Sequence, residues 1–206
     1  MVILQVKSLA IPEVKVIRYK RFVDERGYFT ETYRKEDFET ELAKAVPDFR
    51  IEQTNESRSR KGVVRGLHLQ WNPYMGKLVR TLYGHMLDIV LDLRSSSPTF
   101  GKAVIYDMPA DLDKDYGEWI WVPIGFAHGN LYLEDSAIEY FCTGKYSPGC
   151  EAGIYPFSKD IDWSLADKEL VKKFASLEKK AIISEKDRKG ISIADWKKTE
   201  AAGYFK

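Results

Sequence analysis

A run of short, alternating segments between residues 50 and 146 constrains the fold of this chain more than any other feature. Within 87–94, large aliphatic residues occupy every second position. Side chains of a β-strand point to its two faces in turn, so this segment predicts a strand with two distinct faces. Turn-forming residues separate similar segments at Gly84, 95–98, 113–117, 134–135 and 147–149. Short strands at this spacing predict an antiparallel barrel or jelly roll.

Two segments, 35–46 and 165–178, carry apolar side chains at helical spacing instead. The first predicts a short amphipathic helix that ends before Pro47. The second predicts a helix within a C-terminal helical tail over about 164–206. With 206 residues, of which 44% are hydrophobic, the chain is long enough for one domain with a substantial core and too short for two ordinary ones. We therefore expect one mainly-β domain over 1–206 with short peripheral helices.

Charge and hydropathy exclude several classes of partner. Thirty-two basic and 31 acidic residues leave a net charge of +1, so no overall field favours nucleic acid. No apolar stretch approaches the length of a membrane span, which predicts no membrane partner. Cys142 and Cys150 are too few for a disulfide framework and are expected to be reduced thiols without a role. These features predict a cytoplasmic protein.

Two patterns of glycine and histidine fall among the predicted strands. The first consists of Gly62, His68, Lys77 and Gly84, and the second of Gly117, Pro123, Gly125 and His128. Both are similar to the two sequence motifs of cupins, and the second agrees at each of its defining positions. The resemblance implies that the jelly roll is a cupin.

The first motif lacks the metal ligands that a metal-binding cupin carries. Gln70 and Lys77 stand where an imidazole and a carboxylate would bind the metal. An ammonium group repels a dication and donates hydrogen bonds, so we predict no metal and a cavity suited to an anion. His68 could then act as a base if a partner orients its ring. A buried structural histidine is the alternative, and it is our interpretation of His85.

Six longer motifs are shared with one enzyme family: DERGYFTET, RGLHLQ, GKLVR, SSPTFGK, VPIGFAHG and ISEKD. Over about 14–190 the chain resembles the dTDP-4-dehydrorhamnose 3,5-epimerase family. The resemblance implies a homodimer, with DERGYFTET crossing to the partner subunit, and no metal or organic cofactor. It also implies epimerisation at carbons 3 and 5 of dTDP-4-dehydro-6-deoxy-D-glucose, giving dTDP-4-dehydro-L-rhamnose, in dTDP-rhamnose and polysaccharide biosynthesis.

The resemblance also implies a set of catalytic residues. His68 is the general base, Asp187 in ISEKD orients it, and Lys77 stabilises the enolate oxygen. The proton donor is Tyr140 if the alignment runs back from Ser147. It is position 141, a phenylalanine unable to donate a proton, if the alignment runs forward from His128 without a gap. We favour Tyr140, because a deletion in the turn at 134–135 costs less than a slip within a strand.

Further positions match substrate-contacting residues of the family: Arg26, Glu31, Gln53, Asn55, Arg65, His128, Tyr146, Glu151 and Lys186. Tyr146 corresponds to the tyrosine that stacks on the thymine base, and arginine suits a diphosphate because its guanidinium donates two aligned hydrogen bonds. Strict alternation would put Arg65 and His68 on opposite faces of a strand. Both reach one substrate only if Gly66 permits a bulge or a twist.

Several alternatives stay open at this point. An epimerase acting at carbon 3 or carbon 5 alone would use the same base. A sugar-nucleotide 3,4-ketoisomerase would also transfer protons beside a ketone, although the pairing of His68, Asp187 and Tyr140 argues against it. A non-catalytic sugar-binding cupin would need no base at all. Ala152 stands where the family usually has arginine, and the stretch 153–163 also departs from it, so nucleotide and sugar preference are left undecided.

Overall fold

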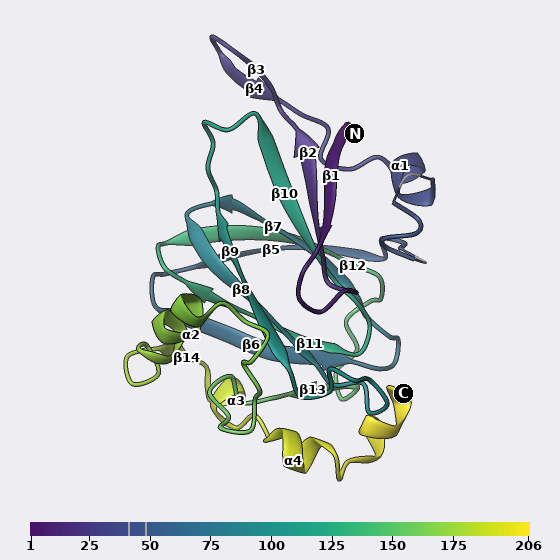
Figure 1. Cartoon of the computed structure of the whole chain (residues 1–206), viewed down its shortest axis with the longest axis vertical. Helices are drawn as coiled ribbons and strands as arrows, with labels where there is room; N and C mark the ends of the chain where they lie inside the picture. The colour runs from purple at the N-terminus through teal and green to yellow at the C-terminus, as the bar shows by residue number, and fades with distance from the viewer. Residues whose placement is uncertain (41, 48) are drawn as a thin grey trace.

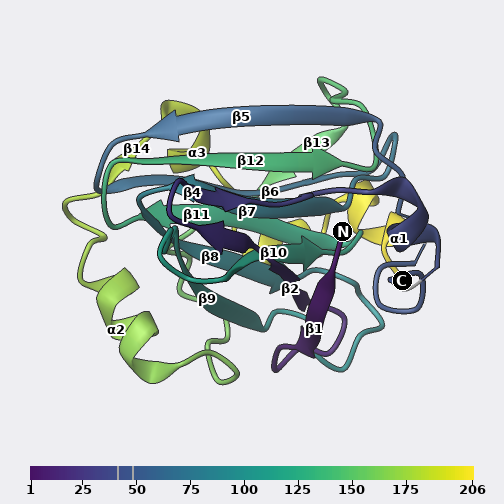
Figure 2. The same ribbon diagram turned by 90° about the horizontal axis from the view of Figure 1, so that it is seen from above.

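The computed structural model describes residues 1–40, 42–47 and 49–206, and two large sheets dominate it. The first sheet has the order β1-β2-β10-β7-β12-β5, and the second β13-β6-β11-β8-β9 with β14 added beside β6. Figure 2 shows the two sheets lying one above the other. The first sheet consists of β1 (Ile3–Ser8), β2 (Lys15–Lys20), β10 (Tyr116–Val122), β7 (Lys77–Tyr83), β12 (Ser136–Cys142) and β5 (Gln53–Ser59). The second consists of β13 (Glu151–Gly153), β6 (Val63–Gln70), β11 (Phe126–Tyr132), β8 (His85–Asp92), β9 (Ala103–Pro109) and β14 (Ile182–Ile183).

Three hydrophobic clusters lie between and outside these sheets. One fills the space between them and includes Val79, Val90 and Ile138. A second covers the outer face of the first sheet. The third lies on the outer face of the second sheet, beneath the C-terminal tail. The strand predicted at 87–94 corresponds to β8, which ends at Asp92, so the prediction is wrong for residues 93 and 94. The two faces of β8 contribute to different clusters, which confirms the prediction of two distinct faces.

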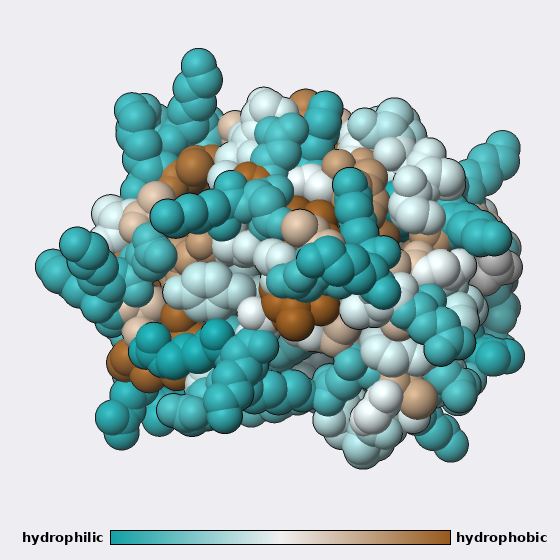
Figure 3. All heavy atoms as spheres, turned by 90° about the horizontal axis from the view of Figure 1, so that it is seen from below, coloured by the Kyte–Doolittle hydropathy of each residue, from teal (hydrophilic) through white to brown (hydrophobic). Residues whose placement is uncertain are grey.

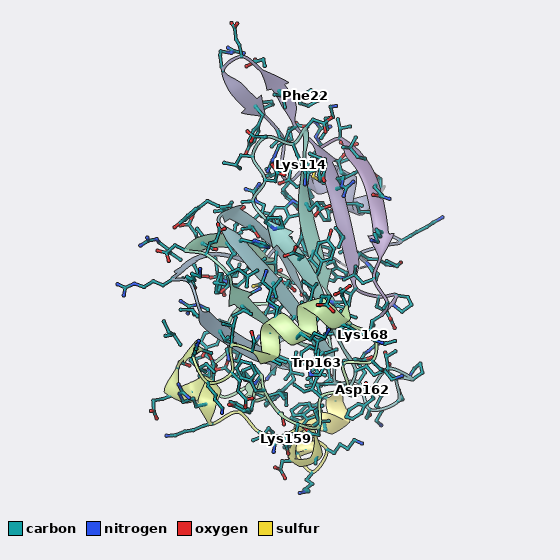
Figure 4. The ribbon with its side chains drawn as sticks, turned by 60° about the vertical axis from the view of Figure 1, so that its left-hand side comes forward. Phe22, Lys114, Lys159, Asp162, Trp163 and Lys168 are labelled. Carbon is teal, nitrogen blue, oxygen red and sulfur yellow. The ribbon has the colours of Figure 1, made fainter. Side chains whose placement is uncertain are left out.

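A small hairpin projects from one end of the molecule. It consists of β3 (Phe22–Asp24) and β4 (Gly27–Phe29), which pair with each other and with no strand of the large sheets described here. Figures 1 and 4 show it extending away from the barrel, with Phe22 labelled in the second view. Phe22, Val23 and Phe29 expose 51%, 55% and 69% of their surface. The hairpin therefore presents three apolar side chains to solvent.

The first predicted helix is shorter than the spacing of its apolar residues suggested. Helix α1 spans Lys35–Glu39, and the described residues after Thr40 form turns, so the prediction of a helix over 35–46 is wrong beyond residue 39. Leu42 and Val46 are nevertheless buried with Phe38 in the cluster outside the first sheet. The apolar spacing reflects burial by successive turns, which keep the same side of the segment inward without continuing the helix.

The second helix, predicted over 165–178, corresponds to the shorter α2 of the structure, and further short helices follow it. Helix α2 spans Lys168–Ala175, and Asp167 caps it by accepting hydrogen bonds from two backbone amides. Phe174 packs against Trp163, which Figure 4 shows beside the helix. The chain continues through α3 (Glu185–Arg188), α4 (Ile193–Trp196) and the 3₁₀ helix η1 (Glu200–Tyr204). Figure 1 shows this tail, in yellow, passing beneath the second sheet.

The surface on the tail side is mainly hydrophilic, with separate hydrophobic patches between charged side chains (Figure 3). No helix among the described residues is long and apolar enough to cross a membrane.

Candidate active site

A cavity of about 570 Å³ opens between the two sheets. Three parts of the chain form it: the inner face of the second sheet, the inner face of the first sheet and residues 182–187 of the tail. Its lining residues are Ser57, Val63, Val64, Arg65, His68, Lys77, His128, Gly129, Asn130, Ile138, Tyr140, Ile182, Ile183, Ser184, Lys186 and Asp187. Six residues predicted from the sequence to contact substrate or act on it are in this set, together with Asp187.

The imidazole of His68 is joined to a carboxylate from the tail. His68 Nε2 lies 2.6 Å from Asp187 Oδ1, although the two residues are 119 positions apart. The backbone amide of Gly66 donates to the other oxygen of Asp187 at 3.4 Å. The Asp187 side chain is 6% exposed and that of His68 is 30% exposed. The pair is therefore anchored on its carboxylate side and open to the cavity on its imidazole side.

Local structure of the tail places Asp187. Strand β14 adds parallel to β6, with Ile182 opposite Val63 and Ile183 opposite Val64. Ser184 then caps α3, accepting a hydrogen bond from the Asp187 amide at 3.1 Å. Burial alone would raise the pKa of Asp187, but the hydrogen bonds from His68, Ser184 and Gly66 outweigh it and hold that pKa below its usual value. Asp187 is thus an ionised acceptor suited to fixing one tautomer of His68.

A bulge in β6 brings Arg65 to the same face as His68. Against β11, His68 faces His128 and Arg65 faces Asn130, so three steps on β6 match two on its neighbour. Gly66 supplies the extra residue with φ +109°, and a side chain there would meet the backbone of Gly129. The bulge that the sequence analysis required at Gly66 is therefore present, and Arg65 and His68 both line the cavity.

The opposite wall carries Lys77 and Tyr140 on neighbouring strands of the first sheet. In the β7 and β12 register, Tyr140 faces Val79 and Cys142 faces Lys77, so Lys77 and Tyr140 are two positions apart along neighbouring strands. Burial lowers the pKa of Lys77, and the nearby Cys142, Asp88 and Glu151 offset part of that effect. Burial raises the pKa of Tyr140, which keeps its phenol protonated.

Phe141 points away from the cavity. It is 7% exposed and packs against Tyr33 and Trp119 in the cluster outside the first sheet. Of the two positions left open by the alignment, only 140 has its side chain in the cavity wall.

A second histidine and carboxylate pair lies beside the first. His128 Nε2 lies 2.8 Å from Asp88 Oδ2, which also accepts a hydrogen bond from Asn130 at 2.9 Å. Asp88 is fully buried, and its other oxygen has no hydrogen-bond partner among the described residues. Because His128 pairs directly with His68 across the strands, both imidazoles come from one wall.

Four predicted substrate contacts, Gln53, Asn55, Tyr146 and Glu151, are not in the cavity lining and are joined to Lys186 by hydrogen bonds. Glu151 accepts hydrogen bonds from the Tyr146 hydroxyl at 2.7 Å and from Lys186 at 2.6 Å. Gln53 accepts one from the Tyr146 amide at 2.8 Å, and its own amide donates to Asn55 at 2.9 Å. The five residues form one connected polar network, in which the backbone amide of Tyr146 supplies the link to Gln53. Lys186 links that network to the cavity, since it belongs to the lining.

Arg26 and Glu31 are not brought to this cavity within the chain. Arg26 lies at the tip of the β3–β4 hairpin, 83% exposed, and pairs with Asp24. Glu31 pairs with Arg34 and the terminal amine, and the Arg34 hydrogen bond, followed by that of the amine, lowers the pKa of Glu31 to about 2. The expectation that both contact substrate therefore finds no support from a single subunit.

Gln70 and His85, which the sequence analysis left outside the predicted site, each have hydrogen-bond partners of their own. The Gln70 amide donates to the carbonyls of Pro73 and Lys145 at 2.8 and 2.9 Å and accepts from the Ser147 amide at 2.9 Å. In the described chain, no group of three or more His, Cys, Asp or Glu side chains is arranged to hold a metal ion. His85 is paired with Asp107 at the far end of β8, away from the cavity residues.

Sequence reasoning missed Asp88, Asn130 and Ser184. Asp88 stood in the alternating strand as a polar residue among aliphatic neighbours, and a buried carboxylate at such a position is a signal that was available. Ser184, three residues before Asp187, has the spacing of a helix N-cap, and this role could also have been predicted from the sequence. Asn130 offered no pattern of its own.

Comparisons of the whole chain with known proteins agree on one family. The family model described as dTDP-4-dehydrorhamnose 3,5-epimerase matches residues 8–195. A relative of that name from Pseudomonas aeruginosa is 39% identical over 191 residues, covering 91% of this chain and 94% of its own.

Solved structures agree. The Legionella pneumophila enzyme, solved in complex with dTDP-4-keto-L-rhamnose, has a TM-score of 0.78 at 33% identity and covers 92% of this chain and 93% of its own. The dTDP-4-dehydrorhamnose 3,5-epimerase of Sulfolobus tokodaii has a TM-score of 0.74 at 39% identity, covering 94% and 97%. The resemblance seen in the sequence motifs and the predicted cupin jelly roll are both confirmed by these matches.

Proposed function

Because this chain belongs to the dTDP-4-dehydrorhamnose 3,5-epimerase family, we propose that it inverts carbons 3 and 5 of dTDP-4-dehydro-6-deoxy-D-glucose to give dTDP-4-dehydro-L-rhamnose. One observation carries the proposal beyond the family match. The His68 and Asp187 pair, joined at 2.6 Å, lies in one wall of a cavity whose other wall carries Tyr140. Inversion of a carbon centre requires a base on one side of the sugar ring and a proton donor on the other.

The reaction begins with removal of a proton beside the ketone. His68 Nε2 is bound to Asp187, so the other ring nitrogen takes the proton, and the carboxylate stabilises the imidazolium that forms. The electrons of the broken C–H bond move into the ketone and give an enolate. Lys77 stabilises the enolate oxygen when protonated, since a preorganised cation in a buried site acts where charge develops. His128, held by Asp88, faces the same region from the base wall.

Return of a proton to the opposite face completes each inversion. Tyr140 is the donor at carbon 5, and burial keeps its hydroxyl protonated at neutral pH by raising its pKa. Arg65, Tyr146 and Lys186 are assigned to the nucleotide portion, with the two cations facing the diphosphate and the tyrosine ring stacking on the base. No metal or organic cofactor takes part in this scheme.

We propose a homodimer in which the β3–β4 hairpin reaches the partner subunit. The supporting observation is the exposed apolar surface of Phe22, Val23 and Phe29, since such patches mark contact surfaces. Crossing would also carry Arg26 and Glu31 to the partner's cavity. Sedimentation of an active monomer would reject this assignment. The cytoplasm is the proposed location, in keeping with the free thiols of Cys142 and Cys150.

Turnover in heavy water tests the function directly. The protein is incubated with dTDP-4-dehydro-6-deoxy-D-glucose, and deuterium at carbons 3 and 5 is followed separately by NMR. We expect deuterium at both carbons and a product of inverted configuration at both. Deuterium and inversion at one carbon alone would identify a mono-epimerase instead. No exchange at either carbon would favour the non-catalytic sugar-binding cupin and overturn the proposal.

A further inference from the structure

The last residues of the chain form a brace for a loop that joins two proposed catalytic residues. We call residues 196–205 the C-terminal strap. Trp196 and Tyr204 contact the ring of Trp71, with ring centres 6.4 and 6.3 Å apart. Phe205 contacts Tyr74 edge to face at 5.5 Å, and the Tyr74 hydroxyl donates to the Tyr204 carbonyl at 3.1 Å.

The strap itself is firmly held against the barrel. Trp196 is fully buried and Phe205 is 3% exposed. The Phe205 carbonyl accepts hydrogen bonds from the Ser95 amide at 2.8 Å and from the Ser95 hydroxyl at 3.0 Å. A segment anchored in this way can transmit rigidity to whatever packs on it.

The braced loop, residues 71–76, connects the strand of the base to the strand of the enolate-stabilising cation. It begins three residues after His68 and ends directly before Lys77. On its other side it is bonded to the segment that carries Tyr146: the Gly76 amide donates to the Thr143 hydroxyl at 2.8 Å, and the Trp71 amide to the Cys150 carbonyl at 3.0 Å. Displacement of this loop would therefore affect both the cation and the residue assigned to the nucleotide base.

The strap begins directly after residue 195, where the match to the family model ends. We propose that the C-terminal strap is a positioning element of the active site, which fixes loop 71–76 so that Lys77 and Tyr146 meet the substrate in the productive geometry. The proposal rests on the proposed function for its catalytic consequence. In this proposal the strap does not contact the substrate, and it acts on the active site only through loop 71–76.

The test compares two deletions of apolar side chains from the same tail. Phe205→Ala removes the contact with Tyr74. Ile193→Ala is the matched control, since Ile193 is 4% exposed in the same cluster, packs beside Gly101 and is not part of the strap. Tyr204→Ala is a milder variant, because that side chain is 44% exposed and its loss spares the core. Each variant is assayed at a temperature where denaturation curves show it fully folded.

We expect Phe205→Ala to lower kcat/KM about tenfold, with kcat reduced and KM raised, because small displacements of positioned groups are costly. Tyr204→Ala should lower it about threefold, and Ile193→Ala should leave it within about twofold of wild type. Phe205→Leu, which restores apolar volume, should recover most of the loss. Amide hydrogen exchange in residues 71–76 should rise in Phe205→Ala and stay at the wild-type level in Ile193→Ala.

Two results would overturn the strap proposal: equal losses in Phe205→Ala and Ile193→Ala, or wild-type kinetics in Phe205→Ala. If the wild-type protein leaves the dTDP-sugar unchanged, the proposed function fails instead. Hydrogen exchange in residues 71–76 would then still decide whether the strap braces the loop, since that measurement needs no turnover.

Discussion

The two walls of the cavity are built in different ways. The wall with Lys77 and the proposed proton donor Tyr140, here called the acid wall, comes from β7 and β12, which pair directly within one sheet. The base wall, with His68, needs a bulge in β6 and a carboxylate that arrives 119 residues later in the chain. One wall thus depends on strand register alone, whereas the other depends on docking of the tail. Changes to the base wall should therefore give larger and less specific losses than changes to the acid wall.

The largest expected effect comes from removing the base. His68→Asn keeps a polar side chain of similar shape and lacks a group that can take the proton. Epimerisation and deuterium exchange should both fall by roughly two to four orders of magnitude, because proton abstraction precedes every later step. Proton NMR in heavy water measures both. A variant that still exchanges at the wild-type rate would remove His68 from the mechanism.

A somewhat smaller loss is expected when the tail's carboxylate is neutralised. Asp187→Asn preserves the volume but no longer stabilises the imidazolium or selects its tautomer, so kcat should fall by roughly 10²- to 10³-fold with little change in KM. Glu185→Gln, an exposed change in the same helix, is the control. Comparable rates for the two variants would mean that the contact between His68 and Asp187 is only structural.

The acid wall should fail selectively. Tyr140→Phe leaves the base intact and removes the donor, so deuterium exchange should continue while inversion at carbon 5 becomes poor. Phe141→Leu is the control for the neighbouring position, which lies outside the cavity. If Tyr140→Phe inverts carbon 5 at the wild-type rate, Tyr140 is not the donor, and a carbon-3 epimerase explains the site better.

The smallest effect is on stability in acid. The pKa of Asp187 is lower in the folded protein than in the unfolded chain, so its contribution to stability is present above about pH 4 and is lost as the pH falls through the folded value. The midpoint temperature of unfolding should therefore drop less between pH 6 and pH 3 in Asp187→Asn than it does in the wild-type protein. Thermal denaturation at both pH values measures this. An unchanged difference would show that other carboxylates dominate acid unfolding.

Prediction from sequence succeeded where local pattern and motif spacing decide the structure. The alternation of β8 and the apolar spacing of α2 were sufficient to locate both elements, although the observed bounds differ from the predicted ones by two or three residues. The bulge at Gly66 was foreseen as a condition, since Arg65 and His68 could not otherwise share a face. Helix α1 was overextended, because buried turns after Thr40 mimic helical spacing.

The remainder depends on contacts distant in sequence. The bond between His128 and Asp88 depends on which strands become neighbours, and no local pattern encodes that order. Likewise, the sequence pattern of residues 196–205 does not predict that they pack against the loop at 71–76. For Arg26 and Glu31, no analysis of one chain could locate the substrate contact, because in our proposal these residues reach the cavity of a second subunit.

The distance along the chain between His68 and Asp187 has a consequence for the life of the protein in the cell. A ribosome delivers the amino-terminal strands first and the tail last, so the barrel can assemble before its base has a carboxylate partner. By our mechanism, a nascent or prematurely terminated chain is a poor enzyme however well its barrel folds. Proteolysis between α2 and α3 would have the same result. The catalytic activity of each molecule would then depend on synthesis of the tail that carries Asp187 and on its remaining attached to the barrel.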